Sequence, residues 1–595
     1  MPEINLDAEQ LAATRTDSRQ ALVLAGPGSG KTRCITERAA WLIEERNVAP
    51  SELLLVTFTR FAANEMRTRL KDRIGRQAAQ VQIGTFHATA LSLLRRFGDL
   101  LGYKPKALTV YSEHESDYLL KEVATDLGVY NGKSWNPRKG EIIKVFDRYY
   151  QEGFLPKEDH PARRVFEEFN LRCFENNSLS YGGLMVQFRK LIPEISQYLH
   201  WKHLILDEGH DADRLQIQVL KLLQHTLSAS IYVVLDLDQT LYSWRGACPD
   251  YWLDHQAEFD IFPLVNNYRS CKQIVEPAGR LIEHNQDRIP RPMVATRTDD
   301  GTVKTMEGMD TEELYTKIFR RYEFDKNTAV LARSHFLLKK LTERLEDEGI
   351  PYSYIGRKTE LLSTDHFCMV HALLKLIVNP FDNFSFLVVR NLLGVSRKAY
   401  NEIRLTASQE DKSHFQVWYD CAEIQPIRDL FQMDDGPPDG VWSFSNILDR
   451  VIDFLDDSEV DPFLTEEALS LVREWRTDTP NGTLAEYLAW LATYAVQDEI
   501  REEDERMKLL SVHQSKGLEF NRVILVGLNE GILPSRQSVE AGDGEIEAER
   551  RIMFVACTRA KDTLILAVRP EQETTETGRD YSNPRSRFIA EMQEK

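Results

Sequence analysis

The chain is predicted to be an α/β protein built on two parallel sheets, each with a mainly helical insertion. Apolar runs of strand length alternate with stretches in which apolar residues recur at helical spacing, and several of these runs end in carboxylates. Strands that alternate with helices pair in parallel, because the crossover helix returns the chain to the same edge of the sheet. At 595 residues the chain is too long for one core, so we expect roughly three or four domains.

The first alternating segment covers about the first 240 residues. Two helices are expected, one with Ile35, Ala39 and Leu42 near helical spacing and one with Met66, Leu70 and Ile74 on one face. The expected strands are residues 21–24, 53–56, 203–206 and 231–235. The stretch from about 91 to 191 is mainly helical, which indicates an insertion into this first sheet.

The second alternating segment begins near Val303. Its expected strands are residues 328–332, 508–512, 522–526 and 563–568, and a helix is expected over 335–346. The stretch from about 386 to 504 interrupts it and is helical, acidic and rich in turns. This stretch is predicted to be a second insertion.

Composition excludes several classes of protein. No apolar run reaches transmembrane length and the first ten residues do not resemble a leader, so a cytoplasmic protein without a membrane partner is expected. Seven cysteines without a CxxC pair argue against a zinc site, an iron–sulfur cluster or a disulfide framework. The net charge of −19 argues against a nucleic-acid partner. Residues 60–76, however, contain six Arg and Lys residues and only two acidic ones, so nucleic acid could still bind to this segment.

A phosphate-binding loop is predicted at residues 25–32, Ala-Gly-Pro-Gly-Ser-Gly-Lys-Thr, between an expected strand and an expected helix. Glycines let backbone N–H groups approach phosphate oxygens, and the helix N-terminus adds partial positive charge. Lys31 would hold the β- and γ-phosphates of ATP and Thr32 would ligate Mg²⁺. The alternative is a Gly-rich turn that caps an ordinary strand–helix unit.

A second signal is the strand 204–206, which ends in Asp207 and Glu208. Phosphoryl transfer needs a carboxylate that holds the metal and a base that orients the attacking water. Asp207 is predicted to hold Mg²⁺ and Glu208 to act as the base. A strand that ends in Asp-Glu is a weak signal alone, and it gains specificity only beside the phosphate-binding loop.

The remaining motifs, taken in chain order, resemble those of the UvrD/Rep/PcrA group of superfamily 1 helicases. The segments that carry this resemblance are 6–10 (Q motif), 56–66 (motif Ia), 84–87 (Ib), 207–211 (II), 235–247 (III), 267–270 (IV), 512–520 (V) and 549–560 (VI). Several long motifs in the family order are far more specific than the phosphate-binding loop alone.

The resemblance implies two RecA-like domains, each with an inserted subdomain, and ATP bound between them. The expected boundaries are domain 1A at 1–95 and 189–277, insertion 1B at 96–188, domain 2A at 278–385 and 505–595, and a reduced insertion 2B at 386–504. A 3′-to-5′ polarity on single-stranded DNA is also implied only by the resemblance.

The resemblance also assigns nucleotide roles to individual residues. Gln239 would sense the γ-phosphate, and Arg269 and Arg559 would act as arginine fingers on the developing charge. Gln10 would recognise adenine, Tyr268 would stack on it, and Glu519 would bond the ribose. The other residues expected at the nucleotide are Gly26, Gly28, Ser29, Gly30 and Arg33.

DNA contacts are expected along the same motifs, through aromatic stacking and contacts to phosphate. The candidate residues are Phe58, Thr85, His87, Tyr242, Trp244, Arg245, Arg333, His513 and Lys516. A lone aromatic residue usually packs in a core. Trp244 lies inside motif III beside Arg245, which favours base stacking, whereas for His87 packing and stacking are equal alternatives.

The chain departs from the family pattern at three places. His210 replaces the usual Gln of motif II, and Phe554 replaces the usual Tyr of motif VI. The second insertion is short, and residues 393–396, Leu-Gly-Val-Ser, stand where the family has a Gly-Ile-Gly-like hairpin that grips duplex DNA. Only a short tail follows motif VI, so no nuclease domain is expected after it.

Three functional hypotheses follow. The first is an ATP-dependent DNA translocase or helicase that acts on single-stranded and tailed DNA in repair, replication or defence. The second is a regulatory ATPase that senses DNA ends or single strands for a partner nuclease and unwinds poorly, which the altered hairpin favours. The third is a DNA-binding scaffold with an inactive nucleotide site, against which the intact Lys31, Asp207 and Glu208 argue.

Overall fold

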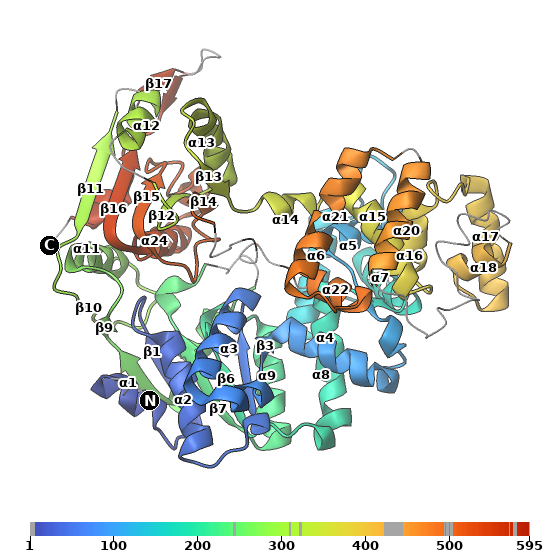
Figure 1. Cartoon of the computed structure of the whole chain (residues 1–595), viewed down its shortest axis with the longest axis horizontal. Coiled ribbons are helices and arrows are strands. Elements are labelled where there is room, and N and C mark those ends of the chain that lie inside the picture. Colours follow the sequence, from blue (N-terminus) through green and yellow to red (C-terminus); the bar gives the residue numbers. More distant parts are fainter. Residues whose placement is uncertain are drawn as a thin grey trace. The chain divides into compact units, whose positions relative to one another are not determined.

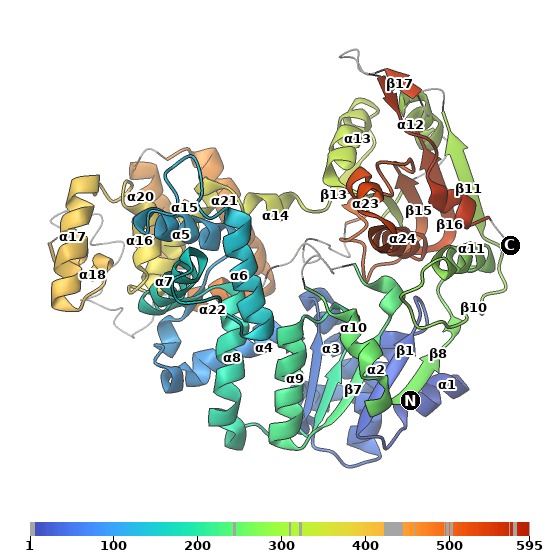
Figure 2. The same ribbon diagram turned by 180° about the vertical axis from the view of Figure 1, so that it is seen from behind.

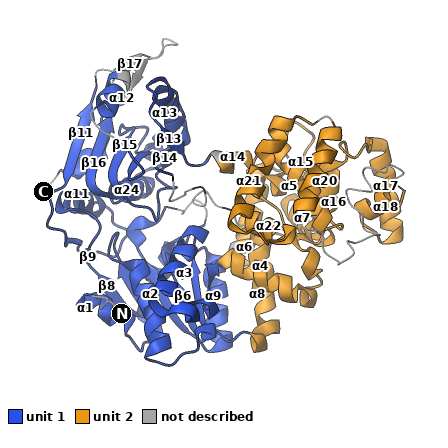
Figure 3. Ribbon diagram, viewed as in Figure 1, with its two compact units in different colours: residues 1–85, 199–356, 495–595 blue, residues 86–198, 357–494 orange. Residues whose placement is uncertain are grey.

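The structure is a computed structural model. It describes residues 6–241, 246–308, 311–320, 324–421, 444–458, 460–492, 494, 499, 504–569, 572–574 and 580–593. The chain forms two compact units. Unit 1 comprises Met1–Thr85, Leu199–Gly356 and Ala495–Lys595, and unit 2 comprises Phe86–Tyr198 and Arg357–Tyr494 (Figure 3).

Unit 1 contains two six-stranded sheets in which all neighbouring strands are parallel, so the predicted fold class is confirmed (Figure 1). The first sheet has the order β3-β2-β6-β7-β1-β8. Its strands are β1 (Gln20–Ala25), β2 (Leu53–Thr57), β3 (Gln82–Thr85), β6 (His203–Leu206), β7 (Ser230–Leu235) and β8 (Asp260–Leu264).

Helices cover both faces of the first sheet. Alternate residues of its strands, such as Ala21, Val23 and Ala25, pack with helices α2 and α3 in one apolar cluster, as expected because successive strand side chains point to opposite faces. Helix α9 lies on the other face, which Figure 2 shows from behind. The helices of this half are α1 (Ala8–Thr14), α2 (Lys31–Glu44), α3 (Arg60–Ile74), α9 (Arg214–Leu227) and α10 (Pro249–Asp254).

The second sheet has the order β11-β16-β15-β12-β14-β13. Its strands are β11 (Thr302–Glu307), β12 (Thr328–Ala332), β13 (Tyr352–Tyr354), β14 (Met507–Ser511), β15 (Phe520–Val526) and β16 (Ala560–Val568). Its helices are α11 (Lys272–Glu283), α12 (Thr311–Phe319), α13 (His335–Asp347), α23 (Arg536–Ala541), α24 (Asp543–Cys557) and α25 (Arg587–Glu591). Short strand pairs β9 (Asn266–Asn267) with β10 (Val294–Ala295), and β17 (Gln572–Thr574) with β18 (Asp580–Ser582), complete the unit.

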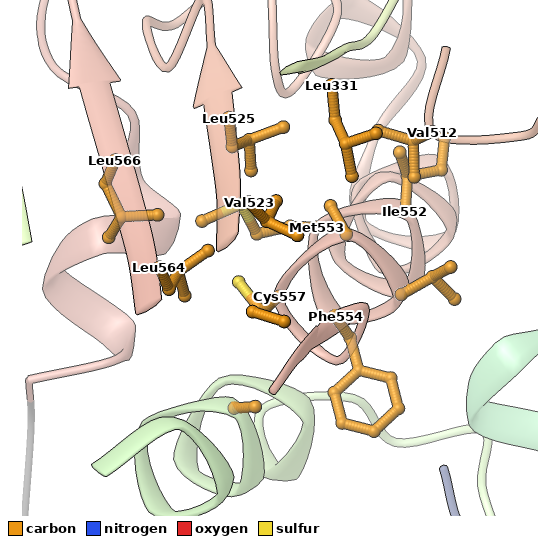
Figure 4. Packing of buried hydrophobic residues seen from close by; sticks show 14 of the residues in the cluster. Leu331, Val512, Val523, Leu525, Ile552, Met553, Phe554, Cys557, Leu564 and Leu566 are labelled. Atoms are coloured by element: carbon orange, nitrogen blue, oxygen red, sulfur yellow. The ribbon is translucent and has the colours of Figure 1, made fainter. Parts of the chain in front are cut away.

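Two apolar clusters sandwich the second sheet. Leu331, Leu525 and Leu566 pack against α24 on one face, and their neighbours in the strands pack against α12 and α13 on the other. Phe554 of α24 belongs to the same cluster and is fully buried, and Figure 4 shows its ring turned away from the labelled strand residues. The phenylalanine found here in place of the family tyrosine therefore fills an apolar site, where a hydroxyl would need a partner.

Unit 2 contains the two segments that interrupt the sheets. From the first come α4 (Phe86–Phe97), β4 (Thr109–Val110), α5 (Glu113–Asp126), α6 (Lys139–Glu152), α7 (Pro161–Glu175), β5 (Ser178–Leu179) and α8 (Tyr181–Ile195). From the second come α14 (Arg357–Leu361), α15 (Asp365–Val378), α16 (Asn383–Val389), α17 (Arg397–Glu410), α18 (His414–Cys421), α20 (Phe444–Asp457), α21 (Pro462–Asp478) and α22 (Leu484–Leu491). None of the helices in the described ranges is long and apolar enough to cross a membrane.

A buried polar network joins the two segments of unit 2. Lys375 of α15 donates to both carboxylate oxygens of Glu115 in α5. The side chains of Lys375 and Glu115 are 7% and 5% exposed. Tyr111 donates to Asp382 at 2.6 Å, and the Asn379 amide donates to Thr109 Oγ1 at 3.0 Å. Burial alone would raise the pKa of Glu115, but Lys375 and the hydrogen bonds with Ser112 outweigh it and lower the pKa.

We expect Lys375→Ala to loosen unit 2, because it leaves the Glu115 carboxylate buried without a counter-charge, a change that costs about 3–5 kcal/mol. Amide hydrogen exchange of α5 and α15 should then quicken by about two to four orders of magnitude at neutral pH. In the wild-type protein, the Lys375–Glu115 pair should stop stabilising unit 2 only when the pH falls through the pKa of Glu115. This pKa lies below the ordinary value of 4.5.

The matched control is Arg138→Ala, which removes the exposed Arg138–Glu141 pair of the same unit and should leave the exchange of α5 and α15 unchanged. Equal exchange in the Lys375→Ala and Arg138→Ala proteins would show that the buried pair does not hold the two segments together.

Candidate nucleotide site

The loop between β1 and α2 has the backbone of an anion cradle. Gly28 and Gly30 have φ values of +68° and +86°, in the region that favours glycine, and Gly30 is the N-cap of the 14-residue helix α2. The Ser29 hydroxyl donates to the Gly26 carbonyl at 2.8 Å and thereby closes the turn. The backbone N–H groups of Lys31 and Thr32, at the N-terminal end of α2, can donate to a ligand.

Neighbouring segments occupy the carbonyl groups of this loop. The amides of Gln10 and Asn267 donate to the carbonyls of Ser29 and Pro27 at 2.8 and 2.7 Å, and the Tyr268 N–H donates to the Gly28 carbonyl at 2.8 Å. The loop therefore presents donors rather than acceptors. A β-carbon at Gly28 would lie 2.6 Å from Arg269 Cβ, so the cradle has no room for a side chain there.

Two carboxylates follow β6 beside the cradle. Lys31 Nζ lies 3.5 Å from Glu208 Oε2, and both side chains are mostly buried. Burial and the adjacent Glu208 raise the pKa of Asp207. Burial acts in the same direction on Glu208, but Lys31, Lys516 and Arg559 outweigh it and lower the pKa of Glu208, so this carboxylate is charged.

The residues around the loop fit a magnesium nucleotide. The donor set comprises the mostly buried Lys31 and the N–H groups at a helix start. It also includes the hydroxyl of Thr32 and the carboxylate of Asp207, which are oxygen ligands of the kind that Mg²⁺ prefers. Glu208 Oε2 is buried and accepts no hydrogen bond of good geometry from the described residues. Such an atom can accept a further hydrogen bond, and an oxygen of the same carboxylate can take the proton of a bound water.

Side chains of the second sheet reach this site within unit 1. Arg559, between α24 and β16, is fully buried and donates to Gln239 Oε1 at 2.9 Å. Burial and the nearby Arg269 lower the pKa of Arg559 to about 9, which still leaves it charged at neutral pH. Gln239 thus lies between Arg559 and Asp236, to which its amide donates.

Arg269 lies directly over the loop and bonds groups of the second sheet. Its Nε donates to Glu519 Oε2 at 2.8 Å and its Nη1 donates to the Thr558 carbonyl at 3.2 Å. Burial alone would raise the pKa of Glu519, but Arg269 and Lys561 outweigh it and hold the pKa at about 2. Tyr268 is 43% exposed and donates its hydroxyl to Asp7, so one part of its ring is open to a ligand.

Lys516, predicted to bind DNA, is buried at motif II. Its ammonium donates to Asp211 Oδ2 and to the Gln239 carbonyl at 2.9 Å, and it lies 2.8 Å from His210 Nε2. Asp211, His210 and Lys516 are at most 8% exposed. A contact between Lys516 and DNA stays a prediction, and it would require these bonds to break.

Sequence reasoning missed two arginines between β9 and β10. Arg288 donates twice to Asp238, at 3.0 and 2.8 Å, and Arg291 donates to Asp236. Arg291 Nη1 also lies very close to the place that a β-carbon of Gly26 would take, so a side chain there would collide with it. The only signal was two positive charges three residues apart, which an exposed segment would also show.

The other candidate DNA contacts lie in varied surroundings. Phe58 is half-buried against the cluster of the second sheet, Thr85 is buried, and His513 is half-buried. Arg333 forms a two-pronged ion pair with Glu549. Within unit 2, His87 is buried and stacks on Tyr181 with ring centroids 3.7 Å apart, and burial lowers its pKa to about 3. Tyr242, Trp244 and Arg245 lie outside the described residues.

The altered hairpin of unit 2 forms a turn between α16 and α17. Gly394 has a φ of +70°, and the N–H groups of Gly394 and Val395 donate to the carbonyls of Asn391 and Arg390. Ser396 caps α17, and its hydroxyl accepts from the Ala399 N–H at 3.2 Å. Ser396 has a φ of −65°, so the missing second glycine costs no backbone strain, but the serine occupies an N–H group that a phosphate would otherwise accept from.

Comparison with known proteins agrees with this geometry. The family described as UvrD/REP helicase N-terminal domain matches residues 6–260, and the UvrD-like helicase C-terminal domain matches residues 262–417 and 466–570. The chain is 28% identical to the ATP-dependent DNA helicase PcrA of Bacillus subtilis (strain 168), over 99% of this chain and 85% of that protein. It is 26% identical to the protein of the same name from Staphylococcus aureus (strain MRSA252), over 99% of this chain and 86% of that protein. The chain therefore belongs to the UvrD/Rep family of ATP-driven DNA helicases.

Proposed function

We propose that the protein is a 3′-to-5′ translocase on single-stranded DNA that hydrolyses Mg-ATP between the two sheets of unit 1. The observation that carries this proposal is the bond from Arg559 of the second sheet to Gln239 of the first, beside Lys31 and Glu208. A site whose charges come from two sheets can close on a nucleotide and open after hydrolysis. The polarity rests on membership of the family.

Each residue has a defined part in this proposal. Lys31 and the N–H groups of α2 bind the phosphates, and Thr32 with Asp207 would hold Mg²⁺, which would neutralise charge on the transferred phosphoryl group. Glu208 accepts a proton from the attacking water at one oxygen of its carboxylate. Arg269 and Arg559 stabilise negative charge as it develops, and Gln239 links Arg559 to Asp236.

A second candidate is a regulatory ATPase that responds to DNA ends or single strands for a partner nuclease and unwinds poorly. The capped hairpin favours it, since Ser396 uses the Ala399 N–H within the chain. A DNA-stimulated ATPase assay run beside a strand-displacement assay separates the two candidates. Stimulated hydrolysis with displacement supports the motor, stimulated hydrolysis without displacement supports the regulatory ATPase, and no hydrolysis contradicts both.

We expect Glu208→Gln to retain ATP binding and to lower kcat by about 10²–10⁴-fold, the usual contribution of a general base. The amide keeps the size of the carboxylate but cannot take the proton. Nucleotide titration and turnover should be measured on the same preparation. Lys31→Ala is the matched variant: it should lose binding as well as turnover, because it removes a phosphate contact. Similar binding and turnover defects in the two proteins would contradict the separate roles.

We expect duplex DNA without a tail to bind much more weakly than 3′-tailed duplex, because the hairpin offers few free N–H groups to duplex phosphates. Ser396→Gly should raise the affinity for blunt duplex by freeing the Ala399 N–H, and should leave binding of single strands unchanged. Both should be measured at one stated salt concentration, since phosphate contacts depend on salt. Equal affinity of the wild-type protein for blunt and tailed duplex would contradict this account.

A further inference from the structure

The ring of His210 faces a hydrogen-bond donor at each nitrogen. Its Nδ1 accepts from the backbone N–H of Asp236 at 3.0 Å, and its Nε2 lies 2.8 Å from the ammonium of Lys516. The side chain is fully buried. A neutral imidazole has one accepting and one donating nitrogen, and an imidazolium has no accepting nitrogen. One of the two contacts is therefore not a hydrogen bond.

Of the two contacts, the one between His210 Nδ1 and the Asp236 N–H is the hydrogen bond. Its N–H belongs to the backbone directly after β7, so it cannot turn away. Burial, Lys516 and Lys31 together keep the pKa of His210 well below its ordinary value, so the ring is neutral. With the lone pair at Nδ1 in use, the proton is at Nε2 and points toward Lys516, which has no lone pair to offer while it is charged.

Two carboxylate oxygens nearby lack a hydrogen bond. Glu208 Oε2 and Asp211 Oδ1 lie 3.5 and 3.6 Å from His210 Nε2, and neither accepts a hydrogen bond of good geometry within the described part of the chain. The Gln239 carbonyl also faces the ring and accepts from Lys516 through one of its two lone pairs, so it is a second acceptor within reach of the ring. Asp211 is likewise held by Lys516 through its other oxygen. Among the described lysines and arginines, Lys31 is the one that pairs with Glu208, at 3.5 Å.

We propose that His210 is a positioning residue for Glu208, and that Lys516 controls it. When Lys31 turns to the phosphates of ATP, the His210 Nε2–H donates to Glu208 Oε2 and fixes the carboxylate with its other oxygen toward the attacking water. Lys516 belongs to the second sheet and occupies the same side of the ring. Displacement of the Lys516 ammonium from the ring, while Arg559 stays at Gln239, therefore leaves His210 free to donate to the base. This inference rests on the proposed ATP hydrolysis and adds its regulation.

The first test separates hydrogen bonding from packing at His210. His210→Phe keeps the ring volume and loses the donor, whereas His210→Gln restores a donor in a different shape. We expect His210→Phe to lower kcat by about 10–100-fold with KM for ATP unchanged, as for other outer-shell groups, and His210→Gln to retain most of kcat. The control is His203→Phe at the start of β6, whose ring bonds Ser230 away from the nucleotide and which should turn over ATP like the wild type.

The reverse order, with His210→Phe active and His210→Gln inactive, would show that the ring only packs and would overturn the proposal. If His210→Phe does not fold, His210→Leu and His210→Asn provide the same comparison between an apolar and a donating side chain. Wild-type protein that hydrolyses no ATP would instead contradict the proposed function itself. The two failures are thus distinguishable.

The second test addresses control by Lys516. The double variant Lys516→Met/Asp211→Asn removes the ammonium together with its buried counter-charge, so no unpaired charge remains. ATP hydrolysis without DNA should rise, and the ratio of DNA-stimulated to basal turnover should fall. The added His210→Phe change should abolish that rise. Basal turnover that stays the same or falls in a folded double variant would contradict control by Lys516.

Discussion

The buried ammonium of Lys516 joins the two sheets of unit 1 at the point where the chemistry would occur. It bonds Asp211 and the Gln239 carbonyl of the first sheet while its own backbone follows β14 of the second. An unpaired buried charge is costly, so separation of the sheets requires Lys516 and Asp211 to find water or other partners together. Lys31 and Glu208, which take part in the proposed nucleotide binding, lie next to these groups. Nucleotide binding therefore affects the same set of charges that holds the two sheets together.

Around this bond the chain builds a closed circuit. His210 accepts from the Asp236 backbone, Asp236 accepts from the Gln239 amide, Gln239 accepts from Lys516 and Arg559, and Lys516 also donates to Asp211, the residue after His210. Motifs II, III, V and VI thus share hydrogen bonds rather than merely lying near one another. Such a circuit has few intermediate arrangements, because a half-satisfied buried network is unfavourable. That property suits a motor that alternates between an open and a closed site.

The sequence predicted the fold class because strands buried on both faces are nearly continuous apolar runs, as at 204–206 and 231–235, and because the motifs stand in family order. It also marked Lys31, Asp207 and Glu208, since phosphate chemistry constrains both residue type and spacing. It missed Arg288 and Arg291, and it did not indicate that Lys516, whose contact with DNA stays a prediction, lies buried in this circuit. The sequence around a charged residue does not show whether its side chain is buried against a carboxylate far away in the chain. Asp211 and Lys516 come together only in the tertiary fold.

The central claim is that arginines bound to groups of the second sheet supply the positive charge that ATP hydrolysis needs. The most direct measurement is single-turnover ATP hydrolysis by Arg269→Ala beside nucleotide binding by the same protein. Arg269 lies over the loop and is held by Glu519 and the Thr558 carbonyl, both of the second sheet. The account predicts near-normal binding with hydrolysis slowed by about 10³–10⁵-fold, the usual effect of an arginine finger. Hydrolysis at the wild-type rate in the folded variant would contradict it.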